Sequence, residues 1–169
     1  GGVFGSNATV NAGPGPLYVA AADLNGDGKI DLVSSDPVYG GPDSLLMVLT
    51  NNGSGHFGSN ATLHAGIGSE AVAVADLNGD GLPDLVCIND GDCPDLPGCS
   101  STLTLFTNRG GGAFGYNSTI NIGIYGTWVE AADDNGDGKL DLICVNAGRG
   151  YGPNTVTVLI NTTPFPPSP

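Results

Sequence analysis

Short apolar or alternating segments, separated by glycine-rich turns, recur in a fixed order along the chain and predict β-strands. Each repeat has a segment before an acidic loop, an apolar run after the loop, a third segment, and a fourth that begins with Phe-Gly. The copies of these segments are 18–21, 71–74 and 128–131; 32–33, 85–88 and 142–145; 45–49, 102–106 and 155–159; and 4–5, 57–58 and 114–115. Because helical periodicity is lacking, we predict an all-β chain with one four-stranded antiparallel sheet per repeat.

The period of the repeat is 53 residues and then 57, measured from Asp23 to Asp76 and from Asp76 to Asp133. The longer second period reflects an insertion between the second and third strands of repeat two. We therefore predict three repeats within residues 1–160, at about 3–55, 56–112 and 113–160, and a proline-rich C-terminal tail at 161–169.

The acidic loop has the same pattern in all three repeats, D-x-N-G-D-G-x-x-D. Side-chain oxygens at loop positions 1, 3, 5 and 9 can converge on one point, with the carbonyl of position 7 as a fifth ligand, because glycines at positions 4 and 6 let the backbone turn sharply. Six to eight oxygens at about 2.3–2.6 Å are the ligands that Ca²⁺ prefers. The predicted ligands for three Ca²⁺ ions are Asp23, Asn25, Asp27, Lys29 and Asp31; Asp76, Asn78, Asp80, Leu82 and Asp84; and Asp133, Asn135, Asp137, Lys139 and Asp141.

Two other interpretations of the loop fit the sequence less well. An EF-hand needs a bidentate Glu at position 12, where this chain has Ser34, Cys87 and Cys144. A short apolar run follows each loop, so the loop is expected to join two strands rather than two helices. An ordinary Asn-Gly or Asp-Gly turn needs no metal, but three intact copies of the ligand pattern favour calcium.

With these loops and strands, the chain resembles the FG-GAP/VCBS repeat family over roughly residues 3–161. That family includes the blades of integrin α-subunit propellers, several calcium-binding lectins, and bacterial or algal surface proteins. The resemblance implies a β-propeller-type array of three four-stranded antiparallel blades, a calcium ion in each blade, and a structural or binding role. Propellers usually have four to eight blades, so three repeats leave closure within one chain in question.

The segments at the two ends of the chain are relevant to whether the array of blades closes into a ring. In this family the Phe-Gly strand is outermost and comes last, so 57–66 would complete blade one and 114–123 would complete blade two. Blade three would lack a fourth strand, while residues 3–12 would form an orphan strand at the N-terminus. We expect another copy to complete blade three by donating this strand, in a head-to-tail ring or filament. The alternatives are a piece of a longer propeller, or a tail that packs on its own domain.

The net charge of the chain limits the classes of partner that it can bind. The formal charge is −13, from 4 Lys and Arg against 17 Asp and Glu, which excludes nucleic acid as a favourable partner. Three calcium ions would bring it to −7. No apolar run is long enough for a membrane span. The chain opens on Gly1 without an initiator Met or signal peptide, so we expect a processed mature form or a fragment, extracellular or on the cell surface.

Cysteines and sequons suggest modifications. Cys93 and Cys99 bracket a short Asp/Pro/Gly stretch and are expected to form a local disulfide. Cys87 and Cys144 occupy the same repeat position, either bridged or as small buried residues, and zinc is disfavoured because the spacing is not C-x-x-C. Glycosylation sequons begin at Asn7, Asn52, Asn60, Asn117 and Asn161; those at 7, 60 and 117 follow the Phe of the outer strand by three residues, at a predicted exposed rim.

Catalysis is not expected. Neither His56 nor His64 recurs across repeats, and Ser34 and Ser35 have no nearby His in sequence. Trp128, Tyr18 and Tyr151 are candidate sugar-stacking residues, although packing within the blades explains them as well. The sequence therefore favours an extracellular, calcium-stabilised structural protein that assembles with copies of itself, with a carbohydrate-binding or adhesion propeller as the alternative.

Overall fold

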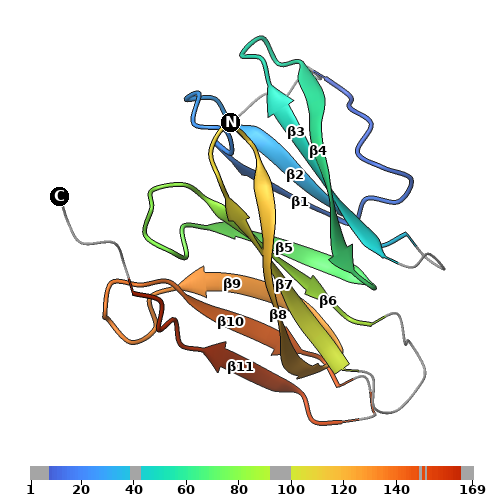
Figure 1. Ribbon diagram of the computed structural model, residues 1–169. Helices are drawn as coiled ribbons and strands as arrows, with labels where there is room; N and C mark the ends of the chain where they lie inside the picture. The colour runs from blue at the N-terminus through green and yellow to red at the C-terminus, as the bar shows by residue number, and fades with distance from the viewer. Residues whose placement is uncertain (1–7, 39–42, 92–99, 149, 151, 165–169) are drawn as a thin grey trace, which may run out of the picture.

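The computed structural model describes residues 8–38, 43–91, 100–148, 150 and 152–164, and within them it contains strands and no helix (Figure 1). The strands are β1 (Tyr18–Ala22), β2 (Asp31–Asp36), β3 (Ser44–Asn51), β4 (Phe57–Gly66), β5 (Ser69–Ala75), β6 (Asp84–Asn89), β7 (Ser100–Asn108), β8 (Phe114–Ile124), β9 (Gly126–Ala132), β10 (Asp141–Asn146) and β11 (Thr155–Leu159). This confirms the predicted all-β class. No helix that could cross a membrane occurs in the described residues.

The strands form three antiparallel sheets whose spatial order follows the chain. Blade one is β1-β2-β3-β4, blade two is β5-β6-β7-β8, and blade three is β9-β10-β11. The fourth strands of the first two blades begin at Phe57 and Phe114, as the Phe-Gly pattern predicted. Blade three has three strands in the described part of the chain, which agrees with the predicted lack of an outer strand.

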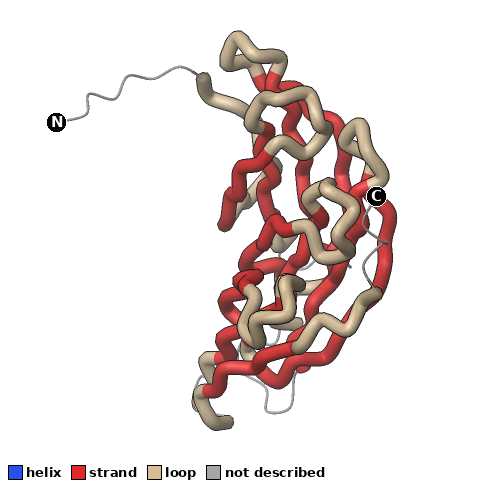
Figure 2. Tube along the Cα trace, turned by 90° about the vertical axis from the view of Figure 1, so that its left-hand side faces the viewer, coloured by secondary structure: helices blue, strands red, loops and turns tan. Residues whose placement is uncertain are grey.

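The three blades stack face to face in an open, curved array (Figure 2). Their first strands, β1, β5 and β9, lie next to one another along the inner side. The rings of Tyr18 in β1 and Trp128 in β9 meet edge to face, with centroids 5.3 Å apart. This contact joins blades one and three across the first strand of blade two, so both aromatic residues serve at least a packing role.

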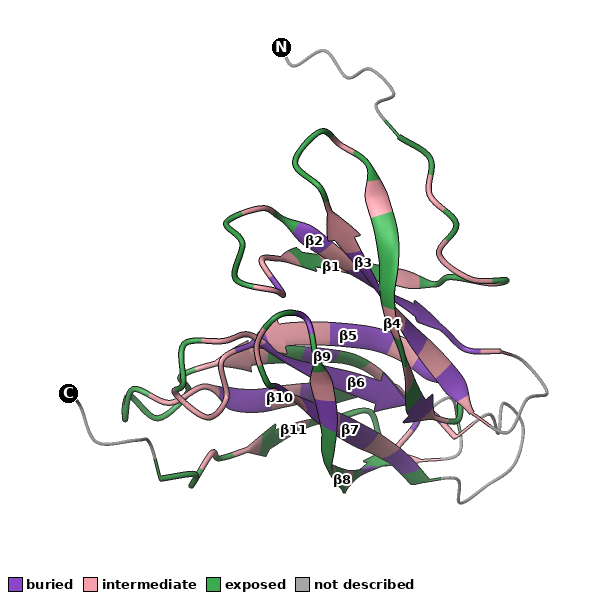
Figure 3. Cartoon of the chain, turned by 45° about the horizontal axis from the view of Figure 1, so that its top comes forward, coloured by how far each residue is buried: buried purple, intermediate pink, exposed green. Residues whose placement is uncertain are grey.

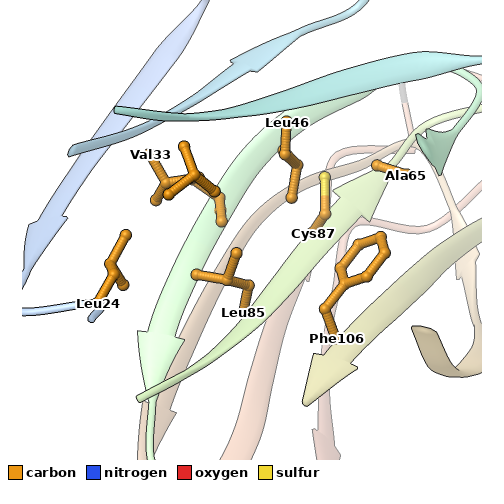
Figure 4. Close-up of a cluster of buried hydrophobic side chains, with 9 residues drawn as sticks. Leu24, Val33, Leu46, Ala65, Leu85, Cys87 and Phe106 are labelled. Atoms are coloured by element: carbon orange, nitrogen blue, oxygen red, sulfur yellow. The ribbon is translucent and has the colours of Figure 1, made fainter. Parts of the chain in front are cut away.

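An apolar cluster fills the junction between blades one and two (Figure 4). Leu24, from the acidic loop, and Leu46, from β3, are fully buried against Leu85 and Phe106 of blade two. Because alternate residues of a strand point to opposite faces, each sheet supplies one such face to each neighbour. The acidic loop therefore contributes to the core through its second residue.

A matching cluster fills the junction between blades two and three. Its buried members are Ala71, Val86, Ile88, Leu103, Ile122, Val129, Leu142 and Cys144. Cys87 and Cys144 lie in separate clusters and are free thiols. Burial raises the pKa of the Cys87 thiol to about 12 and that of Cys144 to about 11, so both stay protonated and unreactive. Of the two alternatives for this pair, the unbridged one is found.

Blade three leaves its far face open to solvent. Val156 in β11 is 63% exposed, whereas Leu46, at the same place in blade one, is fully buried. Val145, Val158 and Ile160 add to this exposed apolar surface. Figure 3 shows the contrast between β11 and the mostly buried strands β6 and β7.

The N-terminal segment has no strand partner in the described part of its own chain. Residues 8–12, the described part of the strand expected at 3–12, form no strand and pair with no neighbour in the described chain. They run beside the open face of blade one, where Val10 and Ala12 line a hollow together with Val19 and Leu32. A segment becomes a strand only when another strand offers its ladder of hydrogen bonds, and no described strand pairs with these residues. Phe4 and Asn7 lie outside the described residues.

Candidate metal loops and the unpaired blade edge

The three acidic loops share one backbone conformation. Glycines at loop positions 4 and 6 have φ values between 76° and 84° in every copy. Such left-handed values favour glycine, which explains why the sequence repeats these two residues without exception. The loop joins the first and second strands of each blade, as predicted.

The side chains of positions 1 and 3 point into the loop. In loop one, Asp23 Oδ1 accepts hydrogen bonds from the amides of Gly26 and Asp27, at 2.8 and 3.1 Å. Asn25 Oδ1 accepts from the same Asp27 amide at 2.9 Å. Because one N–H serves both oxygens, these two oxygens lie close together. The corresponding bonds recur in loops two and three.

Position 5 has a cationic neighbour in loop one. Asp27 Oδ2 lies 2.9 Å from Lys29 Nζ, and its Oδ1 accepts from the Lys29 amide at 2.9 Å. The side-chain hydrogen bond from Lys29, followed by the backbone bond, lowers the pKa of the Asp27 carboxyl. Leu82 stands at the position of Lys29 in loop two, so this ion pair is not a shared feature of the loops.

Position 9 is a buried carboxylate that links the loop to the third strand. Asp31 Oδ2 accepts from the Leu24 amide at 3.1 Å, and Oδ1 accepts from the Asn51 amide at 2.8 Å. Asp84 and Asp141 make the same two bonds in their blades. Burial raises the pKa of the Asp84 carboxyl. Sequence reasoning assigned these residues to metal and missed the structural link.

The predicted ligands fit calcium by their chemistry, but they are not gathered around one point. No group of three or more His, Cys, Asp or Glu side chains among the described residues has metal-binding geometry. Their oxygens hold backbone amides instead. Asp23 Oδ1 accepts two amides, but Oδ2 accepts only one described bond, from the Gly28 amide. An oxygen that accepts one amide keeps a further lone pair with which it can bind an ion. The calcium sites at these fifteen residues stay a prediction.

An asparagine at or just after the end of each third strand donates to backbone carbonyls, and those of blades two and three tie neighbouring blades together. Asn108 Nδ2 donates to the Leu24 carbonyl of blade one at 2.9 Å, and Asn161 Nδ2 donates to the Leu77 carbonyl of blade two at 2.7 Å. Asn51 is the equivalent residue of blade one, and its Nδ2 donates to the Ile30 carbonyl within the same blade. Sequence reasoning missed this role, although an Asn at the same place in each repeat was a signal.

The N-terminal segment enters blade one as an outer strand enters the next blade. Gly13, Gly66 and Gly123 occupy equivalent repeat positions, with φ values of 111°, 112° and 124°. A Cβ on Gly66 would approach Asn89, and one on Gly13 would clash with Asp36, the residue equivalent to Asn89. Gly66 and Gly123 end or nearly end the outer strands β4 and β8. Gly13 therefore occupies the position that follows an outer strand.

The hollow beside blade three is apolar and has a volume of about 150 Å³. It lies between blades two and three, close to the unpaired edge of β11. Its lining residues are Leu77, Leu105, Ile120, Leu140, Leu142, Leu159, Ile160, Asn161 and Thr162.

The predicted glycosylation sites differ in how their amide nitrogens are used. Asn161 Nδ2 makes the bond to Leu77 and a second one to the Leu140 carbonyl, and a glycan on that nitrogen would replace one of its two hydrogens and so break at least one of these bonds. Asn60 Nδ2 donates to the Gly112 carbonyl of blade two, and Asn117 Nδ2 donates to Thr107 Oγ1. Asn52 and Asn117 are exposed. The Cys93–Cys99 disulfide lies outside the described residues.

The candidate residues for catalysis and for sugar binding lie in different parts of the structure. Ser34 and Ser35 are buried in β2, while His64 is exposed and pairs with Asp43 at 3.5 Å. Trp128 is 42% exposed and contacts Tyr18. Tyr151 lies outside the described residues.

Comparison with protein-family models agrees with this architecture. An EF-hand model matches residues 20–32, which cover the first acidic loop but end before the position of the EF-hand glutamate. Strands rather than helices flank that loop. No curated protein matches the chain significantly. An FG-GAP-like repeat model matches residues 35–87 and 76–144, which together cover more than half of the sequence. This chain belongs to the FG-GAP-like repeat family.

Proposed function

We propose that this protein is an extracellular, calcium-stabilised structural protein whose copies assemble head to tail by strand donation. The observation that carries the proposal is the difference between the blades: within the described residues, two have four strands and the third has three. The third strand of blade three, β11, thus has one edge that pairs with no described strand, and such an edge is a template for an added strand.

The N-terminal segment is the donor that fits this edge. Residues 4–13 align with β4 and β8 in the repeat, and Gly13 has the same left-handed backbone as Gly66 and Gly123. The described residues of the segment that precedes Gly13, 8–12, make no strand pairs in the described part of their own chain. Pairing with β11 of a second copy would give blade three of that copy a fourth strand. It would also give the N-terminal segment a sheet with which to form backbone hydrogen bonds.

The faces that flank the donated strand support a head-to-tail contact. Val19 on the open face of blade one is 58% exposed, and Val156 and Val158 are exposed on the open face of blade three. Inside the chain, the equivalent faces meet in the two apolar clusters. A contact between unlike faces either closes into a ring or continues as a filament, and a closed pair of chains would have six blades, within the usual range for propellers.

Calcium would stiffen each blade through the acidic loops. Asp23, Asn25 and Asp27 supply oxygens within one short loop, and the EF-hand match covers the same residues. Bound calcium would neutralise carboxylates that otherwise repel one another, and would brace the loop whose second residue, Leu24, enters the core.

Deletion of residues 1–12 tests the assembly. We expect the full chain to form rings or filaments in calcium, visible by negative-stain electron microscopy, and the truncated chain to remain monomeric. Removal of residues 165–169 is the matched control and is expected to leave assembly intact. Assembly of the truncated chain to the same extent as the full one would contradict strand donation.

An adhesion or carbohydrate-binding role is the second candidate. It is supported by the family and by the partial exposure of Trp128, since an exposed aromatic ring can stack on a sugar. A glycan array probed with the full chain and with a Trp128→Ala variant distinguishes the roles. Binding that is lost in the variant would favour the lectin function.

A further inference from the structure

The apolar hollow between blades two and three has a counterpart between blades one and two that contains a side chain. The repeat places Leu77, Leu105 and Ile120 at the positions of Leu24, Val48 and Leu63. All three of these earlier residues belong to, or pack against, the cluster between blades one and two. The hollow is therefore the equivalent of a slot that is part of the core elsewhere in the chain.

Phe114 packs into that earlier slot. It is the first residue of β8, the outer strand of blade two, and it packs against the cluster between blades one and two. Blade three has no described outer strand, so nothing equivalent to Phe114 is supplied by the described part of the chain. The hollow thus lies where the first residue of such a strand would place its ring.

We propose that this hollow is the receptor site for the Phe4 ring of a second copy. The inference rests on the proposed strand donation and adds its specific anchor. Phe4-Gly5 repeats the Phe57-Gly58 and Phe114-Gly115 pairs at the same distance from the following glycine of the strand end. The lining is almost entirely apolar, which suits an aromatic ring, and burial of a large apolar side chain is a main source of binding energy.

The register within blades one and two sets the register of the donated strand. Met47 pairs with Thr62 and Thr104 pairs with Thr119, which transfers to Thr157 with Thr9 in the repeat. The register then shifts by one residue in both blades, between Val48 and Leu49 and between Leu105 and Phe106.

After that shift, the first residue of the outer strand lies opposite the linking asparagine. Phe57 pairs with Asn51, and Phe114 pairs with Asn108. The same spacing places Phe4 opposite Asn161, which lines the hollow. The strand register and the position of the hollow thus both indicate Phe4 as the occupant.

The protein's own tail contains a competing ring. Phe165 follows Thr162, a lining residue of the hollow, by three positions. A tail that folds back would fill the hollow within one chain and would make it unavailable to Phe4. The two occupants differ in one measurable respect, because only Phe4 makes the occupancy depend on protein concentration.

The test compares two single substitutions in the full chain, Phe4→Ala and Phe165→Ala. We expect Phe4→Ala to raise the concentration needed for half-maximal assembly by about ten-fold or more, and Phe165→Ala to leave it within about two-fold. Analytical ultracentrifugation in calcium measures both. Unchanged melting temperatures of the two variants would show that folding is intact.

A peptide experiment separates the anchor from strand donation itself. A fluorescent peptide of residues 1–12 is expected to bind the full chain carrying Phe4→Ala, while the same peptide with alanine at position 4 binds at least about ten-fold more weakly. Equal binding of both peptides would retain strand donation and overturn the Phe4 site. Unchanged assembly in Phe4→Ala together with a lowered melting temperature of Phe165→Ala would assign the hollow to the tail, and absence of binding by either peptide would overturn both proposals.

Discussion

The two junctions between blades are built from equivalent residues, yet only one of them is complete. Between blades one and two, Phe114 packs against the cluster and Asn108 bridges the blades. Between blades two and three, Asn161 makes the same bridge, but a hollow lies where the ring would be. The junction between blades one and two thus has three contributions, from two sheet faces and from the outer strand of the later blade, whereas the described residues supply only the two faces to the junction between blades two and three.

The open face of blade three also differs in charge from the faces it repeats. Glu130 stands where blades one and two have Ala20 and Ala73, and Asp134 stands where Leu24 and Leu77 enter the clusters. Charged residues on an open sheet limit indiscriminate association. A junction between copies on this face is thus expected to be weaker than the junctions within the chain.

Chelation would remove the calcium ion that each of the three blades is proposed to bind. It is expected to have the largest effect on stability. A site held at a hundred-fold excess of calcium over its Kd contributes about 2.7 kcal/mol. Loss of even one site would lower the melting temperature by roughly 5–10 °C. Differential scanning calorimetry with calcium and with excess chelator measures the shift. An unchanged melting temperature would exclude structural calcium in the loops.

Equivalent residues of β3 and β11 sharpen the comparison between a closed junction and an open face. Leu46→Ala, at a fully buried site, is expected to reduce the free energy of unfolding by about 2–5 kcal/mol. Val156→Ala, at a site 63% exposed, is expected to cost less than about 0.5 kcal/mol in the monomer. Urea denaturation at a concentration too low for assembly measures both. Similar losses would mean that β11 is already covered within its own chain.

The linking asparagines allow a comparison with smaller effects. Asn108→Ala removes two side-chain donations, to Leu24 and Pro83, and is expected to cost about 1–3 kcal/mol because buried carbonyls lose their partner. Asn51→Ala removes one described donation, to Ile30, from an exposed site and is expected to cost about 0.5 kcal/mol or less. Urea denaturation decides this too, and an equal cost for the two substitutions would contradict the bridging role.

Glycosylation is expected to leave both junctions almost unchanged in stability. We propose N-linked glycans at Asn7, Asn60 and Asn117, and we expect Asn161 to be unmodified because both hydrogens of its side-chain nitrogen are used, in bonds to the Leu77 and Leu140 carbonyls. Peptide mapping of protein from its native source, before and after glycosidase treatment, locates the glycans. An unmodified mass would refute the proposal, and a glycan on Asn161 would show that the bridge is dispensable.

Much of the fold was predictable from the sequence because the three repeats can be aligned with one another. The Phe-Gly pairs located β4 and β8 and indicated that blade three lacks a partner for β11. The role of Asp31 was not predictable, since a carboxylate that binds an ion and one that holds two amides have the same sequence pattern. The state of residues 8–12 was not predictable either, because strand formation there depends on a partner outside the local sequence.

Disulfide trapping between copies tests strand donation most directly. Two variants with one introduced cysteine each are mixed, Thr9→Cys and Thr157→Cys, with Cys93 and Cys99 changed to Ser in both. Residues that face each other across antiparallel strands have Cα atoms about 4.5–5.5 Å apart, which a disulfide can span. The buried thiols of Cys87 and Cys144 are not expected to interfere. Mild oxidation should give covalent dimers in the mixture and none in either variant alone, and a Val10→Cys partner should be trapped less efficiently. No dimer in the mixture, or an internal disulfide in a dilute chain carrying both substitutions, would contradict the donated strand.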